Sequence, residues 1–385
     1  MNEKFFSFPQ KLFLFVLVIV WSIVQINRYL TYGFFLSSDS SRYLNEAMMI
    51  LNGDLPSRPL YILYIGYDLF LSIFLYTGLG IPGIMTAQLL LSLVAAYCLY
   101  LLTAKIYDSK AGFLAALFYV SFPRIHIYNF TVLTESFFTS MIIISLFCLV
   151  ISNKPWQKVC SGILLFFTST IRPHGFFLLL AFFVYILYSF FSSKRYKTLI
   201  FVSTIITLTV LFSVKTFGEK ESEIFKRCAV NLMDGYAFLN TWKILEFKGE
   251  PLSFQGDKNV LLTIILFILT NPFYFLKLWA MKISVFFLFI RPFFSKFHNI
   301  VSIVTLVPLY ILGVIGLIQK TEFSGVKLMI VVFCLLQAVS AALIIVEPDG
   351  RDLLPILPLI FIFSASGAQK IPLVKRIISK ASGRC

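Results

Sequence analysis

The chain has 385 residues, of which 59% are hydrophobic and only 13% are charged, well below the charged fraction of about 25% in soluble domains. This composition excludes a soluble globular protein and indicates a helical integral membrane protein, since apolar runs long enough to cross a bilayer recur along it. The formal net charge of +15 does not indicate nucleic-acid binding, because the Lys and Arg residues lie in short clusters between apolar runs, as in cytoplasmic loops.

The first apolar run, residues 12–30, follows Lys4 and Lys11 and is too long for the core of a typical signal peptide. We interpret it as an uncleaved anchor helix whose N-terminus is cytoplasmic. The polar stretch that follows, SSDSSRYLNEAMMILNGDLPSRPL at residues 37–60, is then extracytoplasmic.

Residues 40–52 of this stretch are predicted to form an amphipathic interfacial helix. Arg42, Asn45 and Glu46 face away from its apolar side and are interpreted as solvated, and Asp54 as a turn residue. The apolar side is formed by Tyr43, Leu44, Ala47, Met48 and Leu51.

Asp39 stands where the N-cap of this helix belongs, and the residues alone leave capping and catalysis equally open.

Residues 59–79 are long enough to span a membrane, but they contain Asp68, Gly66 and several tyrosines. Lys105 and Lys110 mark the following loop as cytoplasmic, so a single crossing fits between residues 58 and 105. We assign that crossing to residues 82–104, which leaves 59–79 as a re-entrant or interfacial helix.

The remaining charge clusters define the rest of the topology. Two short helices are expected to meet near Arg172, and residues 259–290 form either no crossing or a tight pair. The other expected spans are residues 111–127, 133–151, 198–214, 300–318, 326–346 and 353–366, with a long extracytoplasmic polar loop at 215–258. This predicts one polytopic domain over residues 1–385, with ten or twelve spans, no internal repeat and both termini cytoplasmic.

No metal or cofactor is expected. Only Cys228 of the six cysteines falls in a long polar loop, so there is neither a disulfide framework nor a metal-type spacing. The three histidines, His126, His174 and His298, are isolated in the sequence.

The predicted topology places several ionisable residues on the same outer face of the membrane: Asp39, Arg58, Glu135, Arg172, Glu347 and Arg351. Each has a structural explanation, because Glu135 can interact with the dipole of its helix and the arginines can anchor to lipid headgroups. Together they suit chemistry on a lipid phosphate, in which arginines hold the phosphate and a carboxylate takes a proton from an attacking hydroxyl.

Five segments, taken in order, resemble the GT-C superfamily of membrane glycosyltransferases. They are SDSSRYLNEAMMILNGDLP, RPLYILYIGYDLFLSIFLYTGLG, FPRIHIYNFTVLTESFF, TSTIRPHGF and EPDGRDLLPILPLI. The similarity covers roughly residues 10–190 and resumes near 347–360. Within the superfamily, the branch most similar contains the protein O-mannosyltransferases and the bacterial transferase that adds aminoarabinose to lipid A.

The resemblance implies a GT-C-like helical bundle that transfers a sugar, with inversion, from a polyprenyl-phosphate donor on the extracytoplasmic face of a bacterial inner (plasma) membrane. The acceptor would be a hydroxyl of a lipid-linked glycan, a lipid or a protein. It implies that Asp39 is the catalytic base, that Glu135 positions the acceptor or the base, and that Arg58, Arg172 and Arg351 bind the donor phosphate.

The sequence departs from the family pattern in the second outer loop, where Thr134-Glu135 replaces an Asp-Glu pair. This departure argues against a paired-carboxylate metal site. No large soluble C-terminal domain is present, so acceptor recognition is expected in the loop at 215–258.

Two other functions stay open. One is an O-antigen-type polymerase or ligase, which would require Arg172 and the 215–258 loop rather than Asp39. The other is a non-enzymatic lipid or glycan transporter, which would carry charges within its spans, where this chain has few.

Overall fold

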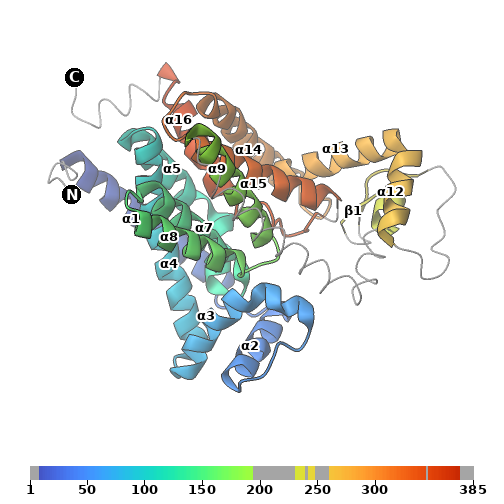
Figure 1. Cartoon of the computed structure of the whole chain (residues 1–385), viewed down its shortest axis with the longest axis horizontal. Helices are drawn as coiled ribbons and strands as arrows, with labels where there is room; N and C mark the ends of the chain where they lie inside the picture. Colours follow the sequence, from blue (N-terminus) through green and yellow to red (C-terminus); the bar gives the residue numbers. More distant parts are fainter. Residues whose placement is uncertain (1–7, 194–229, 239–241, 248–259, 344–345, 373–385) are drawn as a thin grey trace. The chain divides into compact units, whose positions relative to one another are not determined.

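The computed structural model describes residues 8–193, 230–238, 242–247, 260–343 and 346–372 (Figure 1). The chain divides into two compact units. Unit 1 comprises Met1–Phe182, Pro308–Ile330 and Leu354–Cys385, and unit 2 comprises Phe183–Val307 and Val331–Leu353. The prediction of a single membrane domain stays a prediction, and the two units are described separately below.

The described residues are mostly helical. The α-helices are α1 (Phe8–Tyr32), α2 (Ser38–Leu51), α3 (Ile65–Tyr76), α4 (Gly80–Ile106), α5 (Ser109–Ser121), α6 (Pro123–Ile127), α7 (Thr134–Ile151), α8 (Pro155–Ser169), α9 (Gly175–Ser193), α12 (Val260–Thr270), α13 (Pro272–Leu288), α14 (Lys296–Leu317), α15 (Ser324–Leu343) and α16 (Leu357–Ala368). The 3₁₀ helices are η2 (Pro59–Tyr64) and η3 (Tyr128–Phe130), and two short strands, β1 (Tyr236–Phe238) and β2 (Trp242–Lys243), pair antiparallel.

Among the described residues, five helices are long and apolar enough to cross a membrane. These candidate spans are Lys11–Tyr32, Gly80–Ile106, Thr134–Ile151, Lys296–Leu317 and Ser324–Leu343. The prediction of an all-α integral membrane protein is therefore confirmed at this level. The number of spans and their direction stay predictions, and the predicted span at 198–214 lies outside the described residues.

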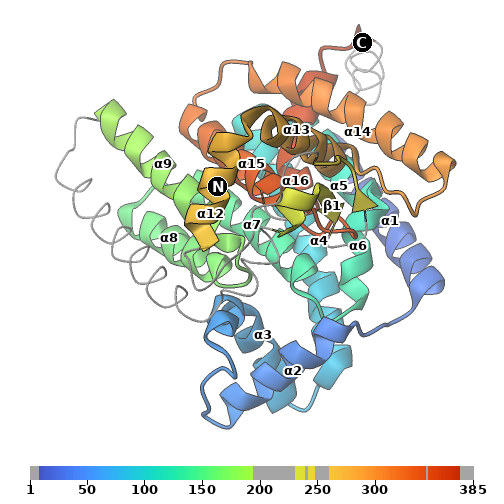
Figure 2. The ribbon, with the colours of Figure 1, turned by 90° about the vertical axis from the view of Figure 1, so that its right-hand side faces the viewer.

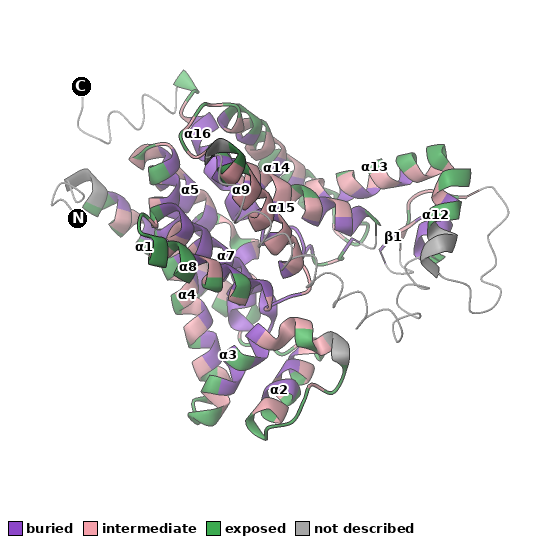
Figure 3. Ribbon diagram, viewed as in Figure 1, coloured by how far each residue is buried: buried purple, intermediate pink, exposed green. Residues whose placement is uncertain are grey.

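Burial separates a central helix of unit 1 from a peripheral one (Figure 3). The apolar stretch of α7 is 78% buried, whereas that of α1 is only 17% buried although both are strongly hydrophobic. A helix that is apolar all round and exposed on one side is suited to contact lipid. We therefore assign α7 to the protein core and α1 to the lipid-facing surface.

Small and polar residues bring the helices of unit 1 together, as is usual within membranes. A Cβ at Gly112 of α5 would lie 2.5 Å from the Tyr100 carbonyl oxygen of α4, so only glycine allows this close approach. The buried Asn129 side chain donates to Gln25 Oε1 at 3.0 Å and to Ser92 Oγ at 3.2 Å. These bonds join the η3 segment to α1 and α4.

The first polar loop folds as a pair of helices, with α2 lying beside α3 in both Figures 1 and 2. The predicted amphipathic helix at 40–52 corresponds to α2, and 59–79 contains η2 and α3. Because α3 has only 12 residues, it is about 18 Å long, too short for a hydrocarbon core of about 30 Å. The non-spanning character of residues 59–79 stays a prediction, because α5 and α16, which lie in predicted spans, are similarly short.

Residues 259–290 of unit 2 were predicted to make either no membrane crossing or a tight pair of crossings. The structure has two helices there, α12 and α13. They contribute Phe267 and Leu278 to a small apolar cluster that also contains Leu232 and Met233. Within the predicted polar loop at 215–258, the described residues 230–238 and 242–247 include the β1–β2 hairpin. The rest of that loop lies outside the described residues.

Gly66, the second residue of α3, provides a test of how this helix is held. Its N–H donates to the Thr170 carbonyl oxygen at 3.0 Å, and a Cβ at Gly66 would lie 2.5 Å from Thr170 Oγ1 and 3.1 Å from the Thr170 carbonyl carbon. We expect Gly66→Ala to destabilise the protein by about 1–3 kcal/mol, measured by thermal unfolding in detergent.

The matched control is Gly162→Ala in α8, where the added methyl would meet Phe182 at an ordinary 3.8 Å. That change should be neutral or stabilising because alanine favours a helix over glycine. Equal unfolding temperatures for both variants would contradict the proposed close approach at Gly66.

Candidate functional site

The start of α2 corrects one expectation about Asp39. The N-cap is Ser37, whose backbone N–H donates to Ser40 Oγ at 3.0 Å. Asp39 is the second residue of the helix and is half-buried. The capping reading of Asp39 is therefore wrong, although a carboxylate in the first helical turn still interacts favourably with the helix dipole. Its role as a base stays a prediction.

Arg42, which was expected to face solvent, instead lies among tyrosines. Its guanidinium carbon is 4.4 Å from the ring centroid of Tyr43, 4.9 Å from that of Tyr61 and 4.8 Å from that of Tyr64. Attraction between a cation and aromatic faces stabilises such an arrangement. Arg42 also interacts electrostatically with Asp39, three residues earlier on the same helix face. Sequence reasoning missed Arg42, although the tyrosines that follow it could have indicated the contact.

Arg58 is exposed and precedes η2, as expected for a residue at the exit of the first loop. Its guanidinium carbon lies 6.0 Å from the ring centroid of Tyr61, the tyrosine that Arg42 also contacts. Two positive charges are therefore gathered around one aromatic ring.

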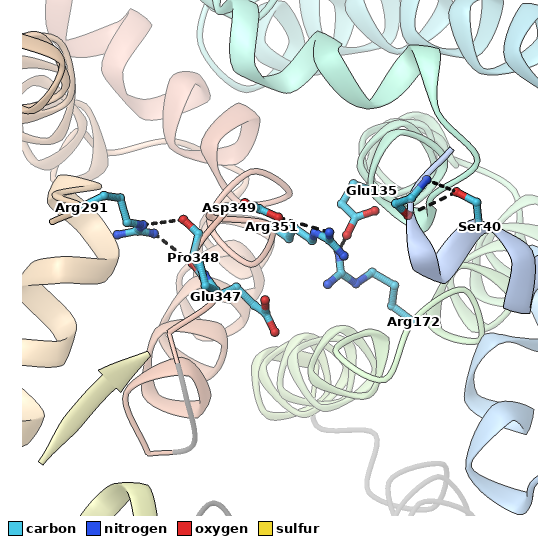
Figure 4. Close-up of polar contacts among 9 residues, drawn as sticks. Ser40, Glu135, Arg172, Arg291, Glu347, Pro348, Asp349 and Arg351 are labelled. Carbon is cyan, nitrogen blue, oxygen red and sulfur yellow. Dashed lines mark hydrogen bonds and ion pairs between the residues drawn. The ribbon is translucent and has the colours of Figure 1, made fainter. Parts of the chain in front are cut away.

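Glu135 and Arg172 form a buried ion pair, and Figure 4 shows their side chains pointing toward each other. Arg172 Nη1 lies 3.0 Å from Glu135 Oε1, and the two side chains are only 9% and 4% exposed. Glu135 is the second residue of α7, and Arg172 belongs to the turn between α8 and α9. The sequence predicted that both residues lie on the outer face of the membrane, and the structure adds the direct contact between them.

The two groups of residues are electrostatically connected through buried tyrosines. The hydroxyls of Tyr43 and Tyr64 both interact with the charges of Glu135 and Arg172 as well as with Arg42. Burial raises the pKa of both tyrosines, so they remain neutral hydrogen-bond donors near neutral pH. The start of α2, the end of η2, the start of α7 and the turn after α8 thus form one site in unit 1.

Aromatic packing and the buried Gln88 side-chain amide attach the α2–α3 pair to the rest of unit 1. The ring of Phe70 in α3 stacks on that of Phe137 in α7 at 4.1 Å. Tyr67 Oη donates to Gln88 Oε1 at 3.1 Å, and Gln88 Nε2 donates to the Thr131 carbonyl oxygen at 2.9 Å. The α2–α3 pair is therefore fixed to both α4 and the segment before α7.

The structure also corrects the expectation for Glu46, which is only 5% exposed. Its carboxylate accepts hydrogen bonds from the Ser57 backbone N–H, at 3.0 Å, and from the Ser57 hydroxyl. Glu46 thereby ties α2 to the end of the loop at Arg58. Asp54 is exposed, as its interpretation as a turn residue requires.

Asp68 of α3 is 1% exposed, and its Oδ1 accepts no hydrogen bond from the described residues. Burial, followed by repulsion from Glu46, raises the pKa of Asp68 to about 8 despite the opposing effect of Arg42. The carboxyl is therefore largely protonated in the folded protein at neutral pH.

Arg351 belongs to unit 2, where its Nη2 lies 3.2 Å from Asp349 Oδ2. Its loop is organised by Arg291, a fully buried residue that sequence reasoning missed. Arg291 Nε donates to the Pro348 carbonyl oxygen at 2.6 Å and Nη2 to that of Glu347 at 3.0 Å, as Figure 4 shows. Asp39, Glu135 and Arg172 are thus brought together within unit 1, and Arg351 is described only within unit 2.

Neither a protein-family model nor a curated protein matches this chain. Within the described residues, no group of three or more His, Cys, Asp or Glu side chains could hold a metal ion. The chemistry of the site therefore follows from its residues. The half-buried Asp39 carboxylate interacts with the Arg42 guanidinium, and the Arg58 guanidinium contacts the same tyrosine ring as Arg42. The buried Glu135–Arg172 pair completes the site.

The Glu135–Arg172 pair yields a stability prediction. Removing one member breaks this buried contact and weakens the compensation of the charge that remains, so Glu135→Gln or Arg172→Met should each cost about 3–5 kcal/mol, and the double variant should cost less than the sum. Unfolding in detergent by denaturant measures these costs. As a control, Asp349→Asn breaks an exposed pair in unit 2 and should cost about 0–1 kcal/mol. Strictly additive single effects would contradict direct coupling of the pair.

Asp68 yields a pH prediction. An unfolded aspartate has a pKa of about 3.9, so a folded pKa of about 8 means that the folded state binds a proton that the unfolded chain releases between these values. Stability should fall as pH rises from about 4 to 8. Asp68→Asn should remove this slope and raise the unfolding temperature at pH 8 more than at pH 5. An unchanged slope would show that Asp68 does not titrate in this way.

Proposed function

We propose that this protein is an inverting glycosyltransferase that moves a sugar from a polyprenyl-phosphate donor to a hydroxyl acceptor on the extracytoplasmic face of a bacterial inner membrane. The acceptor is a lipid-linked glycan, a lipid or a protein. The observation that carries the proposal is the position of Asp39, beside Arg42, on a short non-spanning helix that meets the Glu135–Arg172 pair. The resemblance to GT-C enzymes points to the same residues.

In the proposed reaction, the acceptor oxygen attacks the anomeric carbon from the face opposite the phosphate. The bond between that carbon and the phosphate oxygen breaks, and polyprenyl phosphate leaves with the bonding electrons. Asp39 accepts the proton that the attacking hydroxyl loses. Because attack and departure occur on opposite faces, the configuration at the anomeric carbon inverts.

Arg58 and Arg42 are the residues best suited to the phosphate. Both guanidiniums lie near the ring of Tyr61, and an anion bound beside this ring would offset both positive charges. Guanidiniums bind phosphate oxygens through two parallel hydrogen bonds and offset the negative charge that develops on the leaving group. We place the donor phosphate on this side of the α2–η2 segment.

Glu135 and Arg172 are proposed to position the acceptor and the first loop rather than to bind the phosphate directly. Arg172 is already paired with a carboxylate, which offsets part of its positive charge. The neutral hydroxyls of Tyr43 and Tyr64 interact electrostatically with Glu135 and Arg172 and also with Arg42. They supply hydrogen-bond donors suited to a sugar.

The test uses purified protein, labelled polyprenyl-phosphate sugars and mass spectrometry of the product, with release of polyprenyl phosphate as the rate. Asp39→Asn should lower turnover by about 10²–10⁴-fold, because an alcohol needs a base most in the transition state. Asp54→Asn, which changes an exposed residue of the same loop, should retain the wild-type rate.

Two outcomes would argue against the proposal. Sugar transfer by Asp39→Asn at the wild-type rate would remove Asp39 as the base. Loss of activity in an Arg172 variant that still folds, with Asp39→Asn fully active on a lipid-diphosphate substrate, would favour the polymerase or ligase function instead.

A further inference from the structure

A second polar site lies in unit 1 where several helices end. The end of α4, the start of α5, the turn between α14 and α15, and the end of α16 enclose a cavity of about 880 Å³. Nothing in the proposed transfer reaction uses these residues. The cavity is large enough for a phosphate-bearing headgroup.

The walls of the cavity are tied to one another by hydrogen bonds. Tyr107 Oη donates to the Gly316 carbonyl oxygen at 2.9 Å, joining the end of α4 to α14. Ser366 Oγ donates to Gln319 Oε1 at 3.0 Å, joining α16 to the turn after α14. These bonds connect three separate segments, so the walls of the cavity are held in place by the fold.

Lysines dominate the charge of the lining. Four of them, Lys105, Lys110, Lys320 and Lys370, line the cavity together with two acidic residues, Asp108 and Glu322. The Asp108 carboxylate already accepts hydrogen bonds from the backbone N–H groups of Lys110 and Ala111 and from Gln369 Nε2. The lining therefore carries a net positive charge and has a predominance of cationic donors.

Thr321 adds a polar group that has no partner among the described residues. Thr321 lines the same cavity, and its Oγ1 is shielded from solvent and makes no hydrogen bond with the described residues. A buried hydroxyl without a partner is costly, and an oxygen-rich ligand would satisfy it. The hydroxyl and the lysine ammonium groups together match the oxygens of a phosphate.

The place of the cavity along the helices suggests where the phosphate comes from. The candidate span Gly80–Ile106 ends at the cavity, and the candidate span Ser324–Leu343 begins beside it. The ends of spans lie at the level of lipid headgroups. Lysine clusters there attract anionic lipids of the cytoplasmic leaflet.

We propose that this cavity is a phosphate-binding site, distinct from the candidate transferase site, that holds either the headgroup of an anionic phospholipid or a soluble phosphate compound. A simpler role for the same lysines is to orient the chain by the positive-inside rule. That role requires only charge on the correct side of the membrane, and it does not require a cavity or a bound phosphate.

The test compares two double variants that each remove two positive charges. Lys320→Gln/Lys370→Gln changes two walls of the cavity, and Lys154→Gln/Lys158→Gln changes exposed lysines at the start of α8, outside it. Native mass spectrometry of delipidated protein titrated with phosphatidylglycerol measures lipid affinity. Thermal unfolding with inorganic phosphate, against chloride at equal ionic strength, measures the response to a soluble ion.

We expect the cavity variant to bind phosphatidylglycerol at least about tenfold more weakly than wild type, while the α8 variant stays within about twofold. A charge-preserving variant, Lys320→Arg/Lys370→Arg, should retain binding and shows that loss in the Gln variant is not misfolding. Stabilisation by inorganic phosphate alone, lost in the same Gln variant, supports the site with a soluble ligand.

Equal affinity of all three variants and the wild type, with no response to phosphate, would overturn the proposal and leave the lysines as topology signals. None of these measurements depends on sugar transfer, so they also remain informative if the transferase proposal fails.

Discussion

The buried ion pair between Glu135 and Arg172 is the interaction on which the candidate site depends. Taking two charges out of water is costly, and the attraction between them offsets this cost only at close contact. Here the contact is 3.0 Å long and joins the start of α7 to the turn after α8. The Thr170 carbonyl oxygen before that turn accepts a hydrogen bond from the Gly66 N–H, which fixes the start of α3. Helix α2 packs against α3. The position of Asp39 thus follows from a charge pair far from it in the sequence.

The α2–α3 pair is packed on one side and exposed on the other. One side packs through Tyr43, Tyr67 and Phe70, whereas Met48 and Leu51 of α2 are 47% and 37% exposed. An amphipathic element of this kind is suited to lie in the interface with its exposed apolar residues toward lipid. A lipid-linked donor would reach the carboxylate and guanidinium at the same level, which is consistent with the proposed chemistry.

Cationic residues serve different purposes in this chain, and their partners distinguish them. Arg291 is fully buried and donates to carbonyl oxygens of its own unit, as expected of a residue that holds backbone in place. Arg42 lies among tyrosines near Asp39 and is only half-buried. The lysines at the ends of α4 and α16 surround a cavity. Net charge alone conveys none of these differences.

The sequence by itself determined the membrane class and most helix positions, because hydrophobic length and charge clusters follow directly from the cost of placing polar groups in lipid. It also indicated that two short helices meet near Arg172. Only the tertiary structure decided that Ser37 rather than Asp39 caps α2, that Glu46 is buried against Ser57, and that Arg42 lies among tyrosines. Helical periodicity assigns a residue to a face, but which neighbour covers that face depends on contacts between distant segments.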